Sequence, residues 1–331
     1  MVRGAARVAA GGVLWLTLMM TAGCDKLKTT LLGHGVAGAS AATRELDLRV
    51  RPTILFEVFG ERDDPRMVPI AVLDHGKPQA IHLSANGWRS FDRIYHRPGA
   101  SYTLYQDGRP VGAVTVKQGM WSRPEAPVYT LPSCQNLVPM AAVTLESKVR
   151  AGITVEFLAT SADLIPAAPG SPMDQRAATT LARDIGGRVA DEARIPRRRL
   201  DSLDFHAMAV NTGATHDPTL VVSYVDPNAE EAAAHGDETA YVFAMADRSG
   251  PDYTTSYSES VNGPAAHAEY RRYVDHLDLN GDGTDEIFLE GWQYGGDTYP
   301  MIMRYNAGRW LEIFRGAASW CLDPAVSSSR D

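Results

Sequence analysis

The stretch Asp278-Leu279-Asn280-Gly281-Asp282-Gly283-Thr284-Asp285-Glu286 runs directly into the apolar residues Ile287-Phe288-Leu289. Acidic or amide side chains stand at its first, third, fifth and ninth positions, with a glycine at the sixth. Side chains at alternate positions can turn toward one centre, and glycine allows the positive φ that a tight turn needs. Since calcium takes several oxygen ligands at once, the spacing predicts a calcium loop that leads into a β-strand.

The predicted ligands are oxygen atoms from alternate positions of this loop, namely those of Asp278, Asn280, Asp282, Thr284 through its carbonyl oxygen, and Glu286. A helix–loop–helix calcium site needs a bidentate glutamate at position twelve, where this chain has Leu289. A helical calcium sensor is therefore disfavoured, and Asp285 is expected to point into solvent. The alternative is an acidic turn that binds no ion.

The loop resembles the calcium loops of FG-GAP and VCBS-type repeats, in which Asp-x-Asp-Gly-Asp-Gly-x-x-Asp precedes a strand. The resemblance covers about residues 275–315. It implies a mainly structural calcium ion in a loop that links neighbouring strands of a sheet. Asn280 and Glu286 stand where the family usually has aspartate. The chain has one such loop, whereas a full propeller would have a tandem array.

Residues 1–24 follow the plan of a secretory signal. Arg3 and Arg7 precede a short apolar core at residues 13–20, which is shorter than an ordinary membrane-spanning helix. Residues 21–24, Thr-Ala-Gly-Cys, resemble a bacterial lipobox. This resemblance implies cleavage before Cys24 and attachment of diacylglycerol, with fatty acids such as palmitate, to its sulfur, which anchors the protein on the extracytoplasmic side of a membrane. The alternatives are a plain secretory signal that is cut nearby and a simple membrane anchor.

Further features of the chain bear on location and partners. Asp25 resembles the signal that retains Gram-negative lipoproteins in the inner membrane, facing the periplasm. Cys134 and Cys321 would most simply form a disulfide in an exported protein, with two buried thiols as the alternative. The formal net charge is −8, which argues against a nucleic-acid partner.

Alternating apolar and polar residues from residue 46 onward predict short strands of a small β-sandwich or barrel. Trp88, Phe91 and Tyr95 belong either to its core or to a ligand surface. A helix is predicted to begin after Ser171 as the N-cap, ahead of an antiparallel sheet, which makes the fold class α+β, mostly β. The predicted divisions are a signal peptide at 1–23, a flexible tether at 24–45, the N-terminal β domain at 46–118, a proline-rich crossover at 119–140, and a C-terminal α+β domain at 141–322.

No short catalytic motif is found in the sequence, such as Gly-x-Ser-x-Gly or His-Glu-x-x-His. The aromatic residues Trp292, Tyr294 and Tyr299 flank a glycine-rich loop and form the candidate recognition surface. The sequence therefore favours a membrane-anchored, calcium-stabilised binding protein with a protein or glycan partner. The alternative is a cell-envelope hydrolase whose active-site residues lie far apart in the sequence.

Overall fold

The computed structural model describes residues 45–119, 139–167, 170–294, 296 and 298–316. The described residues all belong to one compact unit. Cys24, Cys134 and Cys321 lie outside the described residues, as do the predicted signal peptide and most of the predicted crossover. The predicted fold class is confirmed, because the described chain is mostly β with a few helices. None of the described helices is both long enough and apolar enough to span a membrane.

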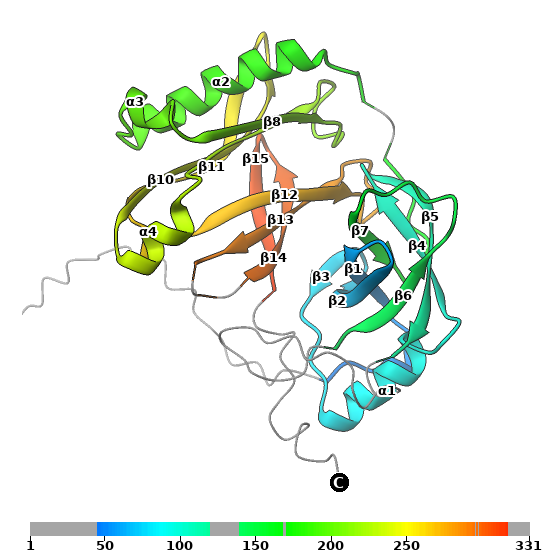
Figure 1. The fold of residues 1–331 in the computed structure, drawn as a ribbon. Helices are drawn as coiled ribbons and strands as arrows, with labels where there is room; N and C mark the ends of the chain where they lie inside the picture. Colours follow the sequence, from blue (N-terminus) through cyan, green and yellow to red (C-terminus); the bar gives the residue numbers. More distant parts are fainter. Residues whose placement is uncertain (1–44, 120–138, 168–169, 295, 297, 317–331) are drawn as a thin grey trace, which may run out of the picture. The chain divides into compact units, whose positions relative to one another are not determined.

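The N-terminal half forms a six-stranded antiparallel barrel (Figure 1). The strand order is β1-β7-β4-β5-β6-β2, and β1 closes the barrel because it pairs with both β2 and β7. The short strand β3 extends the sheet beyond β2. The bounds are β1 (Thr53–Glu61), β2 (Asp64–Asp74), β3 (Lys77–Gln79), β4 (Ser101–Gln106), β5 (Arg109–Gln118), β6 (Ala141–Leu145) and β7 (Thr154–Thr160), preceded by the short helix η1 (Leu48–Val50).

The barrel extends further along the chain than the sequence pattern predicted. The predicted β domain ended at residue 118 and the next domain began at residue 141, yet β6 and β7 both pair inside the barrel. Strand β7 lies between β1 and β4, so the barrel needs residues up to 160 to close. Local alternation indicates a strand but carries no information about its partner, which explains the misplaced boundary.

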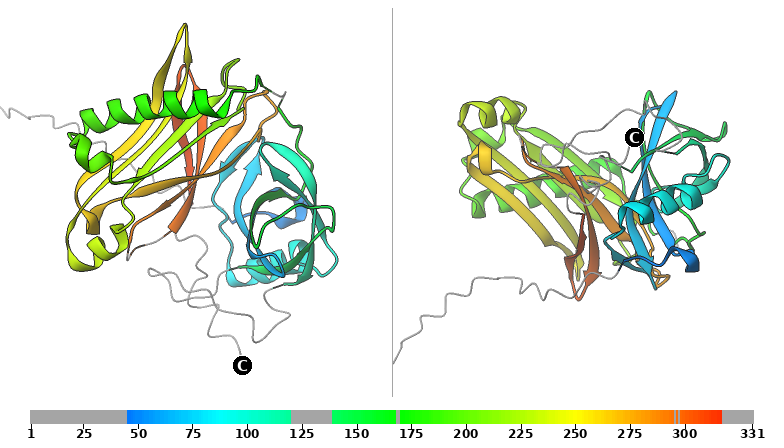
Figure 2. Two further views of the ribbon diagram at one scale, coloured as in Figure 1. Left: turned by 45° about the horizontal axis from the view of Figure 1, so that its top comes forward. Right: turned by 90° about the horizontal axis from the view of Figure 1, so that it is seen from below.

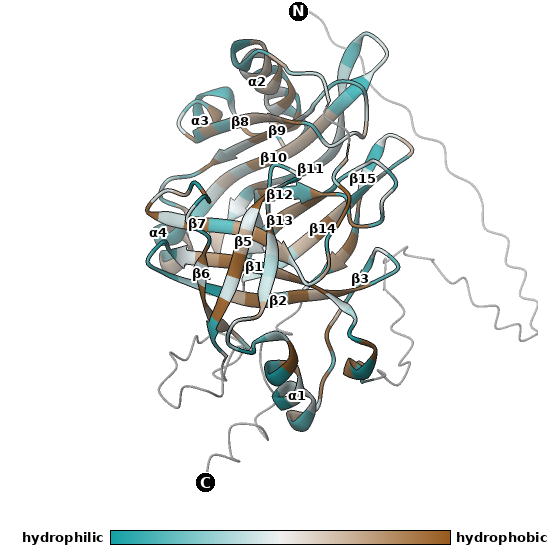
Figure 3. Ribbon diagram, turned by 90° about the vertical axis from the view of Figure 1, so that its right-hand side faces the viewer, coloured by the Kyte–Doolittle hydropathy of each residue, from teal (hydrophilic) through white to brown (hydrophobic). Residues whose placement is uncertain are grey.

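A helix, α1 (Ala85–Tyr95), packs into the barrel core, although Asn86-Gly87 near its start is a pair typical of turns. The Ser84 hydroxyl accepts a hydrogen bond of 3.1 Å from the Gly87 N–H and so caps the helix. Trp88, Phe91 and Tyr95 are all buried, which puts them in the core rather than on a ligand surface. Figure 3 shows both hydrophilic and hydrophobic residues along α1, as expected for a helix with one buried face.

The C-terminal half has two four-stranded antiparallel sheets, called sheet I (order β11-β10-β9-β8) and sheet II (order β12-β13-β14-β15). The long helix α2 covers one face of sheet I (Figure 2), while the other face packs on sheet II. A separate apolar cluster joins sheet II to barrel residues such as Leu55 and Ile70. The bounds are α2 (Gln175–Glu192), α3 (Arg197–Leu200), β8 (Asp204–Val210), β9 (Thr219–Val225), α4 (Ala229–His235), β10 (Glu238–Ser249), β11 (Asp252–Pro264), η2 (Ala265–His267), β12 (Tyr270–Leu277), β13 (Glu286–Trp292), β14 (Thr298–Asn306) and β15 (Arg309–Arg315).

Helix α2 begins later than the sequence predicted. Asp174, rather than Ser171, is the N-cap, because its Oδ1 accepts hydrogen bonds from the N–H groups of Arg176 and Ala177 at 3.1 and 3.2 Å. A carboxylate at this position also interacts favourably with the positive end of the helix dipole. Gly186 faces the sheet so closely that an added Cβ would lie 2.5 Å from Cε2 of Tyr224. The glycine therefore allows the helix to sit against this aromatic ring.

Candidate functional site

The predicted calcium loop joins β12 to β13, and the strand predicted after it is present. Gly281 and Gly283 adopt φ values of +76° and +87°, a region that glycine enters without steric cost. Asp278 is buried and organises the turn: its Oδ1 accepts a hydrogen bond from the Gly281 N–H at 2.7 Å, and its Oδ2 accepts one from the Gly283 N–H at 2.8 Å. The φ of Gly283 confirms the positive value that the sequence predicted for this position.

Asn280 and Asp282 continue the same pattern on the exposed side of the loop. Asp282 Oδ1 accepts a hydrogen bond from the Thr284 N–H at 2.9 Å, and Asn280 Oδ1 accepts one from the Asp282 N–H at 2.9 Å. Asn280 Nδ2 donates to Asp282 Oδ2 at 2.9 Å. These side chains thus stabilise successive turns of the backbone, an arrangement typical of Asp and Asn in tight turns.

Glu286, the last predicted ligand, is buried and points toward a cation of the protein itself. Its Oε1 accepts a hydrogen bond from Arg304 Nε at 2.6 Å, and its Oε2 accepts one from the Leu279 N–H at 2.9 Å. Burial raises the pKa of Glu286 to about 7, against the opposing effects of these hydrogen bonds, and the negative charge of Asp278 adds to the rise. The buried carboxylates of Asp278 and Glu286 therefore repel each other within the loop.

The loop is wedged between the barrel and sheet I. An added Cβ on Gly76, in the turn between β2 and β3, would lie 2.4 Å from Cα of Asn280. An added Cβ on Gly213, in the connection between β8 and β9, would lie 2.4 Å from the carbonyl oxygen of Gly283. Arg304 also donates a 3.0 Å hydrogen bond to the carbonyl oxygen of Gly76. The loop therefore contacts both the barrel and sheet I, besides joining two strands of sheet II.

The donor set of the loop suits calcium in kind, because it consists of carboxylate, amide and carbonyl oxygens. The loop carries the carboxyl groups of Asp278, Asp282 and Glu286, and of these Glu286 pairs with Arg304. In the described part of the chain, however, the loop carboxylates do not form a group of three whose oxygens all lie within 4.8 Å of one another. The predicted ion would compete with Arg304 for Glu286 Oε1, or would leave Glu286 outside its coordination shell.

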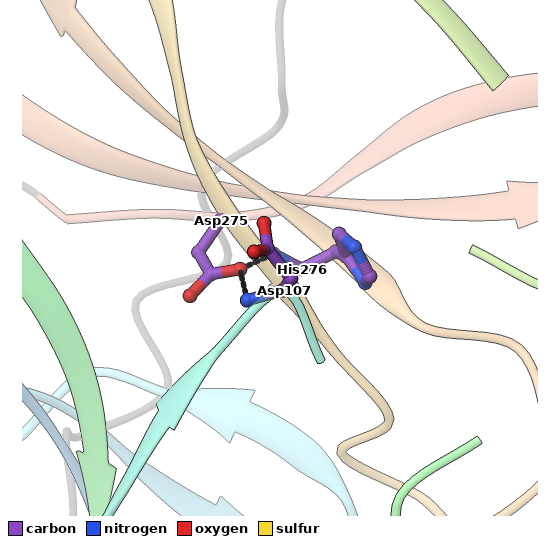
Figure 4. A group of neighbouring side chains, drawn as sticks. All are labelled: Asp107, Asp275 and His276. Carbon is purple, nitrogen blue, oxygen red and sulfur yellow. Dashed lines mark hydrogen bonds between the residues drawn. The ribbon is translucent and has the colours of Figure 1, made fainter. Parts of the chain in front are cut away.

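A second polar group lies beside the loop and includes residues 168 positions apart in sequence. The Asp275 carboxylate Oδ1 accepts hydrogen bonds from the Asp107 N–H at 2.9 Å and from the His276 N–H at 2.7 Å. Figure 4 shows this arrangement, with the imidazole ring of His276 directed away from the Asp275 carboxylate. Asp275 follows a register shift in β12, and it attaches the β4–β5 turn of the barrel to sheet II.

His276 forms a buried pair with Asp285, the loop residue that was expected to point into solvent. That expectation was wrong: Asp285 is 2% exposed, and its Oδ2 lies 2.5 Å from His276 Nδ1. Burial raises the pKa of Asp285, while the interaction with His276 acts in the opposite direction. Gly108 covers the pair so closely that a Cβ there would lie 2.5 Å from Asp285 Oδ2. No local pattern indicated this pair, because the eight residues between His276 and Asp285 include most of the turn.

A polar cleft of about 350 Å³ opens at this pair, with Asp107, Arg109, Asn211, His276 and Asp285 in its wall. In the described residues, five buried side-chain polar atoms lack a hydrogen-bond partner, and two of them, Asp285 Oδ1 and Asn211 Oδ1, belong to this wall. Buried polar atoms are nearly always paired in proteins. Two unpaired acceptor oxygens at one cleft therefore mark a site that a ligand with donors or positive charge would complete.

The predicted recognition surface is divided into two parts. Trp292 stacks on Tyr270 with ring centroids 5.4 Å apart, and Tyr294 meets Tyr270 edge-on at 5.1 Å. Tyr299 lies instead between Arg271 and Arg315, and its hydroxyl donates to Glu269 at 3.1 Å. Trp292 also lines a mainly apolar groove of about 410 Å³ between sheet I and β12, together with Met208 and Phe243.

No protein-family model, no curated protein and no solved structure matches this chain.

Proposed function

We propose that the chain is a lipid-anchored extracytoplasmic protein of the bacterial cell envelope, which binds a protein or glycan partner and is stabilised by calcium. The anchor is Cys24, for which the preceding residues Thr21-Ala22-Gly23 provide the support. If the cell is Gram-negative, Asp25 assigns the protein to the inner membrane. The remaining cysteines, Cys134 and Cys321, form a disulfide in this proposal.

The observation that carries the calcium role is the position of the loop between Gly76 of the barrel and Gly213 of sheet I. An ion that fixes the backbone of residues 278–286 also fixes both contacts, because neither leaves space for a side chain. Its ligands are Asp278, Asn280, Asp282, the carbonyl oxygen of Thr284, and Glu286. Calcium in this role is structural and takes no part in a reaction.

The groove beside Trp292 supports the binding role. Its volume of about 410 Å³ falls within the usual range for small-molecule sites, which are mostly apolar with a few polar groups. Aromatic rings such as Trp292 can stack on the apolar face of a sugar or cover an apolar side chain of a partner protein. Tyr294 and Tyr299 extend the proposed surface beyond the groove.

Thermal unfolding of the full chain in mild detergent, with calcium and then with chelator, tests the calcium role. A ligand at a hundred times its dissociation constant adds about 2.7 kcal/mol of stability, so chelator should lower the melting temperature of the parent. The double variant Asp278→Ala, Asp282→Ala should melt at the same temperature in both conditions. If calcium and chelator give the same melting temperature for the parent, the calcium assignment fails.

A cell-envelope hydrolase is the second candidate function, and the His276–Asp285 pair at the polar cleft is the observation that favours it. A carboxylate that accepts a hydrogen bond from Nδ1 orients a histidine for proton transfer. Release of product from envelope polymers by the parent, and its loss in a His276→Gln variant that still folds, would favour this function. Binding of an envelope glycan without turnover, weakened by Trp292→Ala, would favour the binding protein.

A further inference from the structure

The polar cleft also has the chemistry of a metal site. A ring nitrogen of His276 and one carboxylate oxygen from each of Asp107 and Asp275 lie within 4.8 Å of one another. These three come from two separate parts of the fold, the β4–β5 turn of the barrel and strand β12 of sheet II. Imidazole nitrogen together with carboxylate oxygen is a donor set that suits zinc and related transition metals.

Asp285 supplies the second observation. His276 Nδ1 lies 2.5 Å from Asp285 Oδ2. Because a carboxylate only accepts hydrogen bonds, we assign Nδ1 as the donor, and the remaining nitrogen, Nε2, then keeps its lone pair. Histidine ligands in metal sites commonly donate their other ring N–H to a carboxylate in this way. Asp285 is also 2% exposed, and its other oxygen has no hydrogen-bond partner among the described residues, although the residue lines the cleft.

The three residues of the group have unequal roles. Asp275 Oδ1 already accepts two backbone hydrogen bonds, from Asp107 and His276 (Figure 4), so its main task is to hold the backbones of the other two residues together. The Asp107 side chain is exposed at the turn, and one of its oxygens already belongs to the group. The cleft of about 350 Å³ has room for water molecules to complete the coordination shell.

We infer that this cleft binds a divalent transition-metal ion such as zinc through His276 and Asp107, with Asp285 as the residue that orients the histidine. The site shares no ligand with the predicted calcium loop, although Asp285 belongs to that loop, and it does not depend on the calcium assignment. The open coordination positions face the cleft, where a substrate or partner group can reach the ion.

Isothermal titration of the full chain with Zn²⁺ tests the inference, in mild detergent, with saturating calcium and with thiols blocked by alkylation. We expect one zinc site in the parent. Asp107→Asn should weaken zinc binding at least tenfold, and it should fold normally because asparagine tolerates the left-handed φ of +50° at this position. Asp285→Asn should weaken binding about 10- to 100-fold, the usual cost of losing an orienting carboxylate.

Asp252→Asn is the matched control, because Asp252 is also an exposed aspartate next to a hairpin turn, and it should bind zinc like the parent. The inference is overturned if the parent binds no zinc, or if Asp107→Asn binds it as tightly as the parent does. Equal weakening in Asp252→Asn would show general charge attraction and would overturn it as well. Asp107→Asn remains decisive even if Asp285→Asn fails to fold.

Discussion

The barrel and the contact between α2 and sheet I are built on opposite principles. The barrel core is filled by large rings: Phe56 alone lies within 6.5 Å of the rings of Phe91, Tyr95, His96 and Tyr102, centroid to centroid. The contact under α2 relies instead on small residues, among them Ala178, Ala182 and Gly186 on the helix and Ala244 on the sheet. The barrel core depends on the volume of its side chains, and the contact under α2 depends on close approach of the two backbones. Smaller side chains should therefore destabilise the barrel, and larger ones should destabilise the contact under α2.

The largest effect is expected from a cavity in the barrel. Phe56→Ala removes a fully buried ring and should lower the free energy of unfolding by about 3–5 kcal/mol. Urea denaturation followed by circular dichroism measures this loss. Val50→Ala is the control, because Val50 is 73% exposed and its truncation should change stability by less than about 0.5 kcal/mol. A loss below about 1 kcal/mol for Phe56→Ala would mean that the barrel core is not packed by its rings.

The opposite change should damage the contact under α2. Gly186→Val places carbon atoms against the Tyr224 ring and should cost about 1–3 kcal/mol through overpacking. Gly187→Ala is the matched neighbour, since its added Cβ lies 3.3 Å from the flexible end of Arg197. Alanine favours helix over glycine by about 1 kcal/mol, so Gly187→Ala should raise the melting temperature. Equal changes in melting temperature for the two variants would show that the contact under α2 does not depend on the small size of Gly186.

The junction between the barrel and sheet II should respond to pH. Burial, followed by the charges of Glu156 and Glu290, raises the pKa of Glu57 to about 8, while Arg272 acts in the opposite direction. Between about pH 4.5 and 8 the folded protein therefore keeps a proton that the unfolded chain has released, so stability falls as the pH rises through this range. Glu57→Gln should reduce this loss by about 1–2 kcal/mol, less than the pKa difference implies because Glu57 is partly exposed.

Urea denaturation of the parent and of Glu57→Gln at pH 5 and pH 8 measures the difference. Glu61→Gln is the control, because Glu61 is exposed at the end of the same strand and should leave the pH dependence unchanged. Parallel pH profiles for the parent and Glu57→Gln would show that the carboxylate of Glu57 ionises normally in the folded protein.

Local patterns in the sequence were sufficient to predict the fold class and most strands. They failed where the same residues are compatible with both a turn and a helix. Asn86-Gly87 is a strong turn signal, yet Ser84 before it is a helix cap, and Trp88, Phe91 and Tyr95 follow at helical spacing. The segment forms a helix because the helix buries these three rings in the barrel core. Which strands pair, and so where the barrel ends, depends on contacts that no local pattern records.

The predicted calcium loop was recognisable as a turn because its oxygens and glycines lie within nine consecutive residues. The polar cleft was not predictable, because Asp107 reaches Asp275 only after the barrel has been placed against sheet II. His276 stands beside the loop in the sequence, but nothing local indicated that Asp285 turns inward to meet it. The assignment of Cys24, Cys134 and Cys321 stays a prediction.

The pairing of β1 with both β2 and β7 has a consequence for the order in which the barrel folds. Strand β1 finds its first neighbour within a few residues of chain, but its other edge stays open until β7, which ends at Thr160, has been placed beside it. Barrel closure must therefore bring together segments about a hundred residues apart, which makes it a late, non-local step. Until then an apolar strand edge is exposed and can pair with other chains, so a chaperone that covers β1 would increase the yield of folded protein.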